Sequence, residues 1–130
     1  MDVVIFCGGR GTRLSEKTDI IPKALVPIGD RPILWHLMKT YSAFVHNRFI
    51  LTLGYKGEMI KEYFLKYPWL HSNFEINMKQ PQIPAIDEDW NVLFLDTGVK
   101  SNTGLRLHMA KEHIKGNTFM VTYGDGLGNF

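Results

Sequence analysis

The chain has 130 residues, of which 45% are hydrophobic and 22% charged, and these proportions exclude a disordered or fibrous protein. Its length suits one domain over residues 1–130, with room for a hydrophobic core. The 15 basic and 13 acidic residues give a formal net charge of +2, which is too balanced for a general nucleic-acid-binding protein. Any recognition of anions is therefore expected to be local.

The sequence also bears on location and redox chemistry. No apolar run is long enough to span a bilayer, and no charged leader with an apolar core is present, so we expect a cytoplasmic protein with no membrane partner. The single cysteine, Cys7, cannot form a disulfide within the chain. Its place in an apolar run favours a buried thiol over a nucleophile.

The first predicted element is an apolar, β-branched run, Val3–Phe6, that stops at glycine. Such a run is typical of a strand buried on both faces of a parallel sheet. The glycines within residues 8–11 allow a sharp turn in which backbone N–H groups approach an anion without a Cβ in the way. Arg10, Arg13 and Lys23 add positive charge. The segment therefore predicts a phosphate site.

Two common nucleotide-binding motifs do not match this turn. The third small residue of the dinucleotide fingerprint is missing, and no Gly-Lys-Ser/Thr ending of a P-loop is present. The second apolar strand, Phe49–Leu53, leads into Gly54 and not into the acidic residue that holds a ribose in dehydrogenases. A different class of nucleotide site is therefore indicated.

Two helices flank that second strand in the prediction. Apolar spacing predicts a helix over residues 33–45, with apolar residues up to Phe44 and Val45 on one face and Pro32 in its first turn. The next helix is expected from Glu58 to Tyr67, where Pro68 ends it.

The second half of the chain continues the alternation. Phe74, Ile76 and Met78 alternate with polar residues and predict a half-exposed strand near a sheet edge, followed by a loop over residues 79–90. The remaining expected elements are a strand over residues 91–95, a helix capped by residues 101–103 that bears Leu107, Ala110 and Ile114, and a last strand over residues 118–122.

Alternating strands and helices predict an α/β fold, with a mostly parallel sheet and helices on both of its faces. Ligands of such sheets bind beyond the carboxyl ends of the strands. The glycine turn after the first strand and Gly124-Asp125-Gly126 after the last one both lie at those ends. We therefore expect two segments that are distant in sequence to converge on one crevice.

The motifs resemble those of a known family. The pattern Gly8-Gly9-Arg10-Gly11-Thr12-Arg13-Leu14 is followed by Pro22-Lys23 and by Pro27-Ile28-Gly29, with Pro32-Ile33-Leu34 close behind. This pattern resembles the signature of the sugar-1-phosphate nucleotidylyltransferases, which join a nucleoside triphosphate to a sugar phosphate and release pyrophosphate. Residues 54–57, 95–98, 103–107 and 123–126 further resemble the glucose-1-phosphate cytidylyltransferase branch.

The resemblance implies a Rossmann-like nucleotidyltransferase fold and a Mg²⁺-dependent transfer from CTP to a sugar 1-phosphate, glucose 1-phosphate, that yields CDP-glucose and pyrophosphate. Members of the family are considerably longer, so the resemblance also implies that the fold is truncated at its C-terminal end. A sheet cut short at its last strand exposes an unpaired edge, and we expect a homo-oligomer.

The resemblance also assigns roles to residues. Arg13 is expected at the leaving β- and γ-phosphates, Lys23 between the α-phosphate and the sugar phosphate, and Asp125 at the Mg²⁺ ion. The residues expected to bind the nucleotide are Gly8, Gly9, Gly11, Thr12, Arg13, Lys23, Thr103, Gly104 and Arg106.

Several alternatives stay open at this point. The cytidylyltransferases carry a second glycine where Leu105 stands, so the base preference is open, with dTTP or UTP as alternatives to CTP and mannose 1-phosphate as an alternative sugar. A rival interpretation is a catalytically inactive fragment that binds nucleotide, or a regulatory or assembly module.

Overall fold

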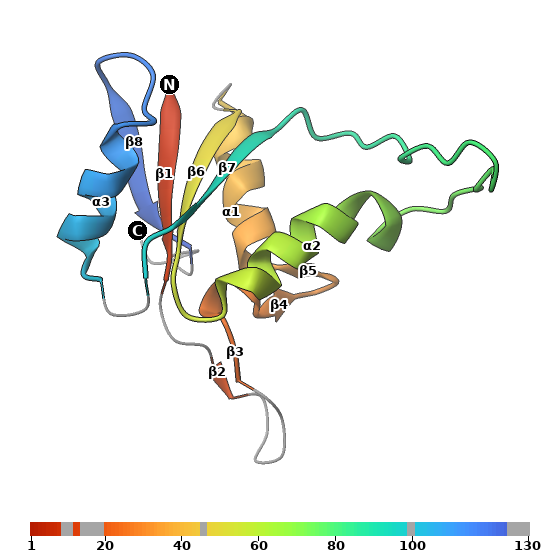
Figure 1. Cartoon of the computed structure of the whole chain (residues 1–130), viewed down its shortest axis with the longest axis horizontal. Coiled ribbons are helices and arrows are strands. Elements are labelled where there is room, and N and C mark those ends of the chain that lie inside the picture. Colours follow the sequence, from red (N-terminus) through yellow and green to blue (C-terminus); the bar gives the residue numbers. More distant parts are fainter. Residues whose placement is uncertain (9–11, 14–19, 45–46, 99–100, 125–130) are drawn as a thin grey trace.

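The structure is a computed structural model that describes residues 1–8, 12–13, 20–44, 47–98 and 101–124, with the backbone alone described at residues 12, 13 and 20. Its centre is a sheet of four parallel strands in the order β7-β6-β1-β8 (Figure 1). These strands are β1 (Asp2–Cys7), β6 (Arg48–Leu53), β7 (Asn91–Asp96) and β8 (Phe119–Tyr123). The expected parallel sheet is confirmed.

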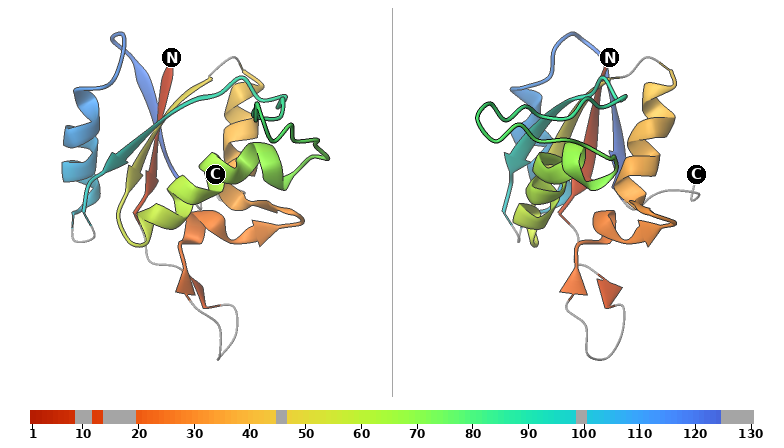
Figure 2. Two further views of the ribbon diagram at one scale, coloured as in Figure 1. Left: turned by 45° about the vertical axis from the view of Figure 1, so that its right-hand side comes forward. Right: turned by 90° about the vertical axis from the view of Figure 1, so that its right-hand side faces the viewer.

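Helices cover both faces of this sheet, as expected (Figure 2). The helices α1 (Ile33–Ser42) and α2 (Gly57–Leu70) pack on one face, and α3 (Thr103–Lys111) packs on the other. A hydrophobic core lies on each face of the sheet. Alternate residues of β1 belong to these two cores, because successive side chains of a strand point to opposite faces. Val3 and Ile5 belong to the first core, and Val4 and Phe6 to the second. No helix among the described residues is both long and apolar enough to cross a membrane.

Short elements that the sequence did not predict follow the carboxyl end of β1. The strands β2 (Thr12–Arg13) and β3 (Ile20–Ile21) pair antiparallel, and a one-turn 3₁₀-helix, η1 (Lys23–Leu25), comes next. The strands β4 (Pro27–Ile28) and β5 (Arg31–Pro32) then form a tight hairpin, whose Gly29 has a φ of 67°. These elements lead the chain from the sheet into α1.

An ion pair joins elements at the amino ends of the parallel strands, opposite the end at which β1 leads into the short elements. Asp2 is buried and accepts hydrogen bonds from Arg48 Nη1 and from the backbone N–H of Lys115. Arg48 also donates to the carbonyl of His113, at 3.0 Å. The start of β1, the start of β6 and the turn after α3 are thereby held together.

Helix boundaries differ from the prediction in three places. Pro68 does not end α2 but lies inside it, two residues before its last residue. Near the carboxyl end of a helix a proline removes only one of the last hydrogen bonds, and the anchored ring of Tyr67 holds this turn in place. Helix α1 ends at Ser42, which leaves Phe44 exposed, while Val45 lies outside the described residues. Helix α3 ends before Ile114, which packs on the second core from a turn.

The strand predicted from Phe74 to Met78 is wrong. Residues 73–77 form neither helix nor strand, no strand pairs with them among the residues that the structure describes, and a turn follows. The alternation of apolar and polar residues is present, but these apolar side chains are exposed. An alternating sequence forms a strand only where a neighbouring strand pairs with its backbone groups, and the described part of the chain places none beside these residues.

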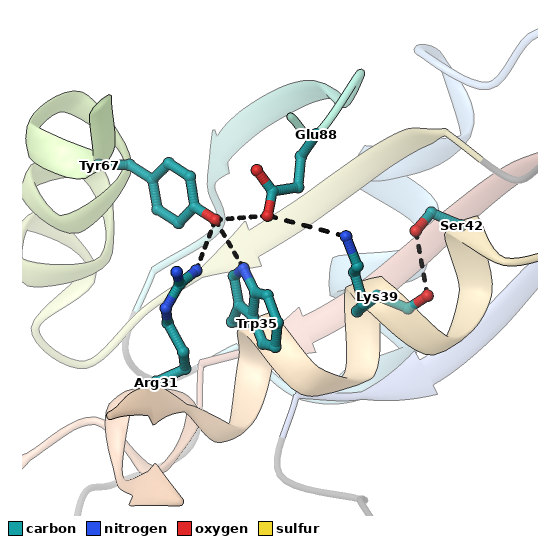
Figure 3. A network of polar contacts seen from close by, with 6 residues as sticks. All are labelled: Arg31, Trp35, Lys39, Ser42, Tyr67 and Glu88. Atoms are coloured by element: carbon teal, nitrogen blue, oxygen red, sulfur yellow. Dashed lines mark hydrogen bonds and ion pairs between the residues drawn. The ribbon is translucent and has the colours of Figure 1, made fainter. Parts of the chain in front are cut away.

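A buried tyrosine links four segments on the α1 side (Figure 3). The hydroxyl of Tyr67, from α2, accepts hydrogen bonds from Arg31 Nη1 and Trp35 Nε1 and donates one to Glu88 Oε1, each at 2.7 Å. Lys39 Nζ lies 3.8 Å from the same Glu88 oxygen. The hydroxyl thus uses its one donor and both acceptor positions. Its partners join β5, α1 and the segment before β7 to α2.

Burial and hydrogen bonding shift the acidity of this network. Burial, together with the bond to Glu88, raises the pKa of Tyr67. Burial alone would raise the pKa of Glu88, but the hydrogen bond from Tyr67 and the charge of Lys39 outweigh it and lower that pKa. The network is therefore stabilised with Tyr67 protonated and Glu88 ionised.

We predict that Tyr67→Phe lowers the free energy of unfolding by about 1–3 kcal/mol, because it leaves the Trp35 and Arg31 donors and the Glu88 carboxylate without their shared partner. Urea denaturation followed by circular dichroism measures the change. Tyr41→Phe serves as a control, since Tyr41 packs on the core between α1 and the sheet and lies outside the network. Equal midpoints for Tyr67→Phe and the wild-type protein would contradict this role.

We also predict a pH-dependent cost for Glu88→Gln, which keeps an acceptor for the Tyr67 hydroxyl but removes the charge. The pKa of Glu88 is lower in the folded state than the ordinary value of 4.5, so ionised Glu88 stabilises the fold above that value, and this contribution is lost as the pH falls through the folded-state pKa. The gap in unfolding free energy between wild type and Glu88→Gln should therefore narrow in acid. A gap that is constant with pH would refute the assignment.

Candidate functional site

A cavity of about 220 Å³ lies at the carboxyl ends of β1 and β8. Strand order reverses between these two strands, because β6 and β7 lie on one side of β1 and β8 on the other. Ligands of open α/β sheets bind in the crevice outside such a switch point. The residues that line the cavity are Phe6, Cys7, Gly8, Lys23, Ala24, Thr103, Arg106, Tyr123 and Gly124.

Glycines at two strand ends keep this crevice open. The N–H of Gly124 donates to the carbonyl of Phe6 at 2.9 Å, which extends the pairing of β8 with β1 by one step. A Cβ on Gly124 would lie 3.1 Å from Cys7 Sγ and 3.3 Å from Ala24 Cβ, and a Cβ on Gly8 would overlap the guanidinium of Arg106. At Gly8 the guanidinium of Arg106 occupies the space that a side chain would need, and at Gly124 a Cβ would crowd Cys7 and Ala24.

Arg106 is the most deeply buried cation of the site, with only 6% of its surface exposed. It lies in the first turn and a half of α3, a helix whose cap residue Asn102 accepts a hydrogen bond from the N–H of Leu105 at 2.8 Å. Its Nη2 donates to the carbonyl of Gly98 at 3.1 Å. The guanidinium also packs against Gly8 and Gly54, so it contacts the chain beyond β1, β6 and β7.

The buried Cys7 of the sequence prediction is confirmed, with 3% of its surface exposed, and it forms part of the cavity wall.

Lys23 reaches the same cavity from η1. Its neighbours Pro22 and Ala24 are buried, whereas Lys23 itself is exposed. The turn is held by hydrogen bonds from the N–H of Leu25 to the carbonyl of Pro22, at 2.9 Å, and from the N–H of Val26 to the carbonyl of Lys23, at 3.1 Å. Burial of the two neighbours fixes the direction in which the lysine leaves the backbone.

Of the two residues in the first turn of α3 that were predicted to bind the nucleotide, one borders the cavity and the other does not. Thr103 lines the cavity, whereas Gly104 does not, although both are exposed. Leu105, which stands where the cytidylyltransferases carry a glycine, is 48% exposed and is not part of the cavity wall. The amino end of α3 points its partial positive charge toward the space that Thr103 borders.

Other predicted site residues are described only in part or not at all. The backbones of Thr12 and Arg13 form β2, and Gly9, Gly11 and Asp125 lie outside the described residues. Their predicted contacts with phosphate and Mg²⁺ stay predictions. Gly124, which directly precedes Asp125 in the sequence, borders the cavity. Among the described residues no three His, Cys, Asp or Glu side chains gather as metal ligands.

Three site-shaping residues were missed by sequence reasoning. Tyr123 lines the cavity and packs against Phe6, with ring centroids 5.5 Å apart. Gly54 and Gly98 contact the Arg106 guanidinium. The signal that could have found them is positional, since each lies at or just after the carboxyl end of a parallel strand. The arrangement as a whole gathers Lys23, Arg106 and a helix amino end around one space, which suits a polyanion.

Comparisons with known proteins agree with this geometry. Residues 2–122 match the family described as nucleotidyl transferase. Over 99% of its length the chain is 50% identical to a probable glucose-1-phosphate cytidylyltransferase of Bacillus subtilis and 46% identical to the glucose-1-phosphate cytidylyltransferase of Salmonella typhimurium. The chain spans 52% of the length of each of these relatives.

Solved structures show the same fold. HddC of Yersinia pseudotuberculosis, in complex with GMP-PN, superposes with a TM-score of 0.68 and 30% identity, covering 95% of this chain and 47% of its own. The inositol-1-phosphate CTP transferase of T. maritima superposes with a TM-score of 0.65 at 14% identity, covering 95% of this chain and 43% of its own. The predicted Rossmann-like nucleotidyltransferase fold is confirmed, and the chain belongs to the nucleotidyl transferase family.

Proposed function

We propose that this chain is the nucleotide-binding part of an enzyme that transfers CMP from CTP to glucose 1-phosphate, giving CDP-glucose and pyrophosphate. One observation carries the proposal. Lys23 and Arg106 come from segments that are far apart in the sequence and meet beside Gly8 and Gly124 at the switch point of the sheet. The identity of 50% to a probable glucose-1-phosphate cytidylyltransferase supports the choice of base and sugar.

The proposed reaction is an in-line substitution at the α-phosphorus. A phosphate oxygen of the sugar phosphate forms a bond to that phosphorus, the bond from the α-phosphorus to the β-phosphate oxygen breaks, and pyrophosphate leaves with the electron pair. No covalent intermediate with the protein is required. The protein contributes by holding two polyanions together and by neutralising the charge that develops on their oxygens.

Each residue has a role in this scheme. Lys23 is a point charge beside the transferring α-phosphate, and Arg13 contacts the leaving phosphates. Arg106 positions the glycine-containing loops beyond β1, β6 and β7 and adds buried positive charge behind them. Asp125 is the carboxylate that would hold Mg²⁺, which neutralises charge on the phosphates when bound. A cytoplasmic location and a homo-oligomeric state complete the proposal.

Two alternatives to this function, a different base and binding without turnover, can be distinguished by experiment. HddC was solved with GMP-PN, so a purine nucleotide is the alternative to CTP. A chain that covers 52% of its relatives' length can also bind nucleotide without turning it over. Titration with CTP, GTP, UTP and dTTP separates the bases, and an assay for pyrophosphate release with glucose 1-phosphate separates binding from turnover. For the 130-residue chain we expect CTP binding with little or no turnover.

We predict that Lys23→Ala weakens binding of CTP in Mg²⁺ by about tenfold, which corresponds to ~1.4 kcal/mol, because it removes one cation from the cavity wall. Isothermal titration calorimetry measures the change. The matched control is Lys66→Ala, an exposed lysine on α2 that pairs with Glu62 at 3.5 Å. If Lys23→Ala binds CTP as tightly as Lys66→Ala does, the proposed role of Lys23 is wrong.

A second prediction compares two glycines. Gly8→Ala should lower both stability and CTP affinity, because its Cβ overlaps the Arg106 guanidinium. Gly104→Ala should keep or raise stability by up to ~1 kcal/mol, since its Cβ would meet only Asn102 Oδ1 at 3.5 Å and alanine favours a helix. Thermal unfolding and calorimetry measure both. Similar losses at the two positions would show that the crowding at Gly8 is not what shapes the site.

A further inference from the structure

The segment that carries Lys23 is only partly held by the hydrophobic cores. Ala24 belongs to the first core and Leu25 packs against it, whereas residues 27–30, in the hairpin of β4 and β5, are exposed. The hairpin lies beside the start of α1 (Figure 1). Because its exposed residues bury little apolar surface, the hairpin depends on polar contacts for its position.

Backbone hydrogen bonds connect this hairpin with Lys23. The N–H of Val26 donates to the carbonyl of Lys23 at 3.1 Å, and the N–H of Ile33, at the start of α1, donates to the carbonyl of Val26 at 2.9 Å. In the hairpin Arg31 lies opposite Ile28. A two-residue turn joins the strands and fixes their register, so a shift of β5 also moves β4 and the turn before it.

Arg31 ties the hairpin to α1 and α2. Its Nη1 donates to the Tyr67 hydroxyl at 2.7 Å, and its guanidinium lies over the Trp35 ring, 4.6 Å from the centroid (Figure 3). A planar guanidinium can stack on a ring and donate in a fixed direction at the same time. On the other strand, His36 Nε2 donates to the carbonyl of Ile28 at 2.9 Å. Both strands of the hairpin are therefore bonded to helices.

The hydroxyl of Tyr67 fixes the direction of the Arg31 side chain. It also accepts a hydrogen bond from Trp35 Nε1 and donates one to Glu88 Oε1, each at 2.7 Å, so its bonding positions are all in use. Arg31 lines a small cavity of about 90 Å³ with Tyr67 and Glu88, and it is not among the residues that line the nucleotide crevice. Any effect of Arg31 on a nucleotide in the crevice must therefore be indirect.

We propose that Arg31 is a positioning residue for nucleotide binding, which sets the place of Lys23 at the crevice through the hairpin. The inference rests on the proposed function, because it takes Lys23 as a contact of the α-phosphate. Binding of a phosphate depends on the exact position of its partners, and a displacement of about 1 Å is enough to weaken it. A lysine on a released hairpin keeps its charge but loses that position.

A second cation of the same network provides a matched control. Lys39, on α1, lies with its Nζ 3.8 Å from Glu88 Oε1. Lys39→Ala and Arg31→Ala each remove one positive charge from the network, so their long-range effect on an anionic ligand is similar. Only Arg31→Ala also removes the bond between β5 and Tyr67.

Titration calorimetry of the whole chain with CTP and Mg²⁺ tests the proposal. We expect Arg31→Ala to weaken binding by about threefold, and Lys39→Ala to leave it unchanged. In the Lys23→Ala background, Arg31→Ala should cause no further loss, because the residue through which it acts is absent. A stabilising contact that has nothing to do with Lys23 would not show this dependence. Circular dichroism checks that each variant is folded.

Hydrogen–deuterium exchange tests the anchoring without any ligand. The N–H groups of Leu25 and Val26, which close the turn around Lys23, should exchange faster in Arg31→Ala than in Lys39→Ala, measured relative to the N–H groups of β1. Tyr67→Phe should have the same effect, since it removes the acceptor of Arg31. Equal exchange at Val26 in Arg31→Ala and Lys39→Ala would overturn the inference.

The binding results separate this inference from the proposed function. Loss of CTP affinity in Lys23→Ala but not in Arg31→Ala would overturn the inference and leave the proposed function standing. A loss in Arg31→Ala that persists in the Lys23→Ala background would also overturn it, because Arg31 would then act elsewhere. Unchanged affinity in Lys23→Ala would instead contradict the proposed function, and the inference would fall with it.

Discussion

The structure depends on the complete enclosure of strand β1. All its residues are buried, β6 and β8 pair with its two edges, and helices cover its two faces. A strand enclosed in this way leaves only its ends accessible, so ligand-binding groups can gather only at a strand end. At the carboxyl end the chain places Gly8 and brings Lys23, Arg106 and Gly124 to the same space.

Arg106 shows how the two layers of the fold cooperate at this end. Its backbone belongs to α3, on one face, while its guanidinium lies against Gly8, Gly54 and the carbonyl of Gly98. The glycines admit the cation, and the cation occupies the volume that their missing side chains leave. Lys23 arrives from the opposite face, on a turn held by its buried neighbours. The cavity is thus lined by residues from elements on both faces of the sheet.

Local patterns predicted the parts of the fold whose cause is local. The buried strand at Val3–Phe6 and the position of Gly8 and Gly124 beside one crevice could be predicted, because an apolar, β-branched run indicates a buried strand and parallel strands end at the same side of a sheet. The prediction failed where distant groups decide. Pro68 is tolerated because Tyr67 is anchored by residues from three other segments. Residues 74–78 have the alternation of a strand, but no strand of the described part of the chain pairs with them. Side-chain positions at Arg13 and Asp125 stay predictions.

The ion pair at the amino ends of the strands has a practical consequence. Asp2 is anchored to Arg48 and to the backbone of Lys115, whereas Met1 just before it is 57% exposed (Figure 1). The first residue thus emerges at the end of the sheet remote from the crevice. A purification tag or a fluorescent fusion attached to Met1 lies away from the crevice, and the protein can be immobilised through it for surface-based titrations.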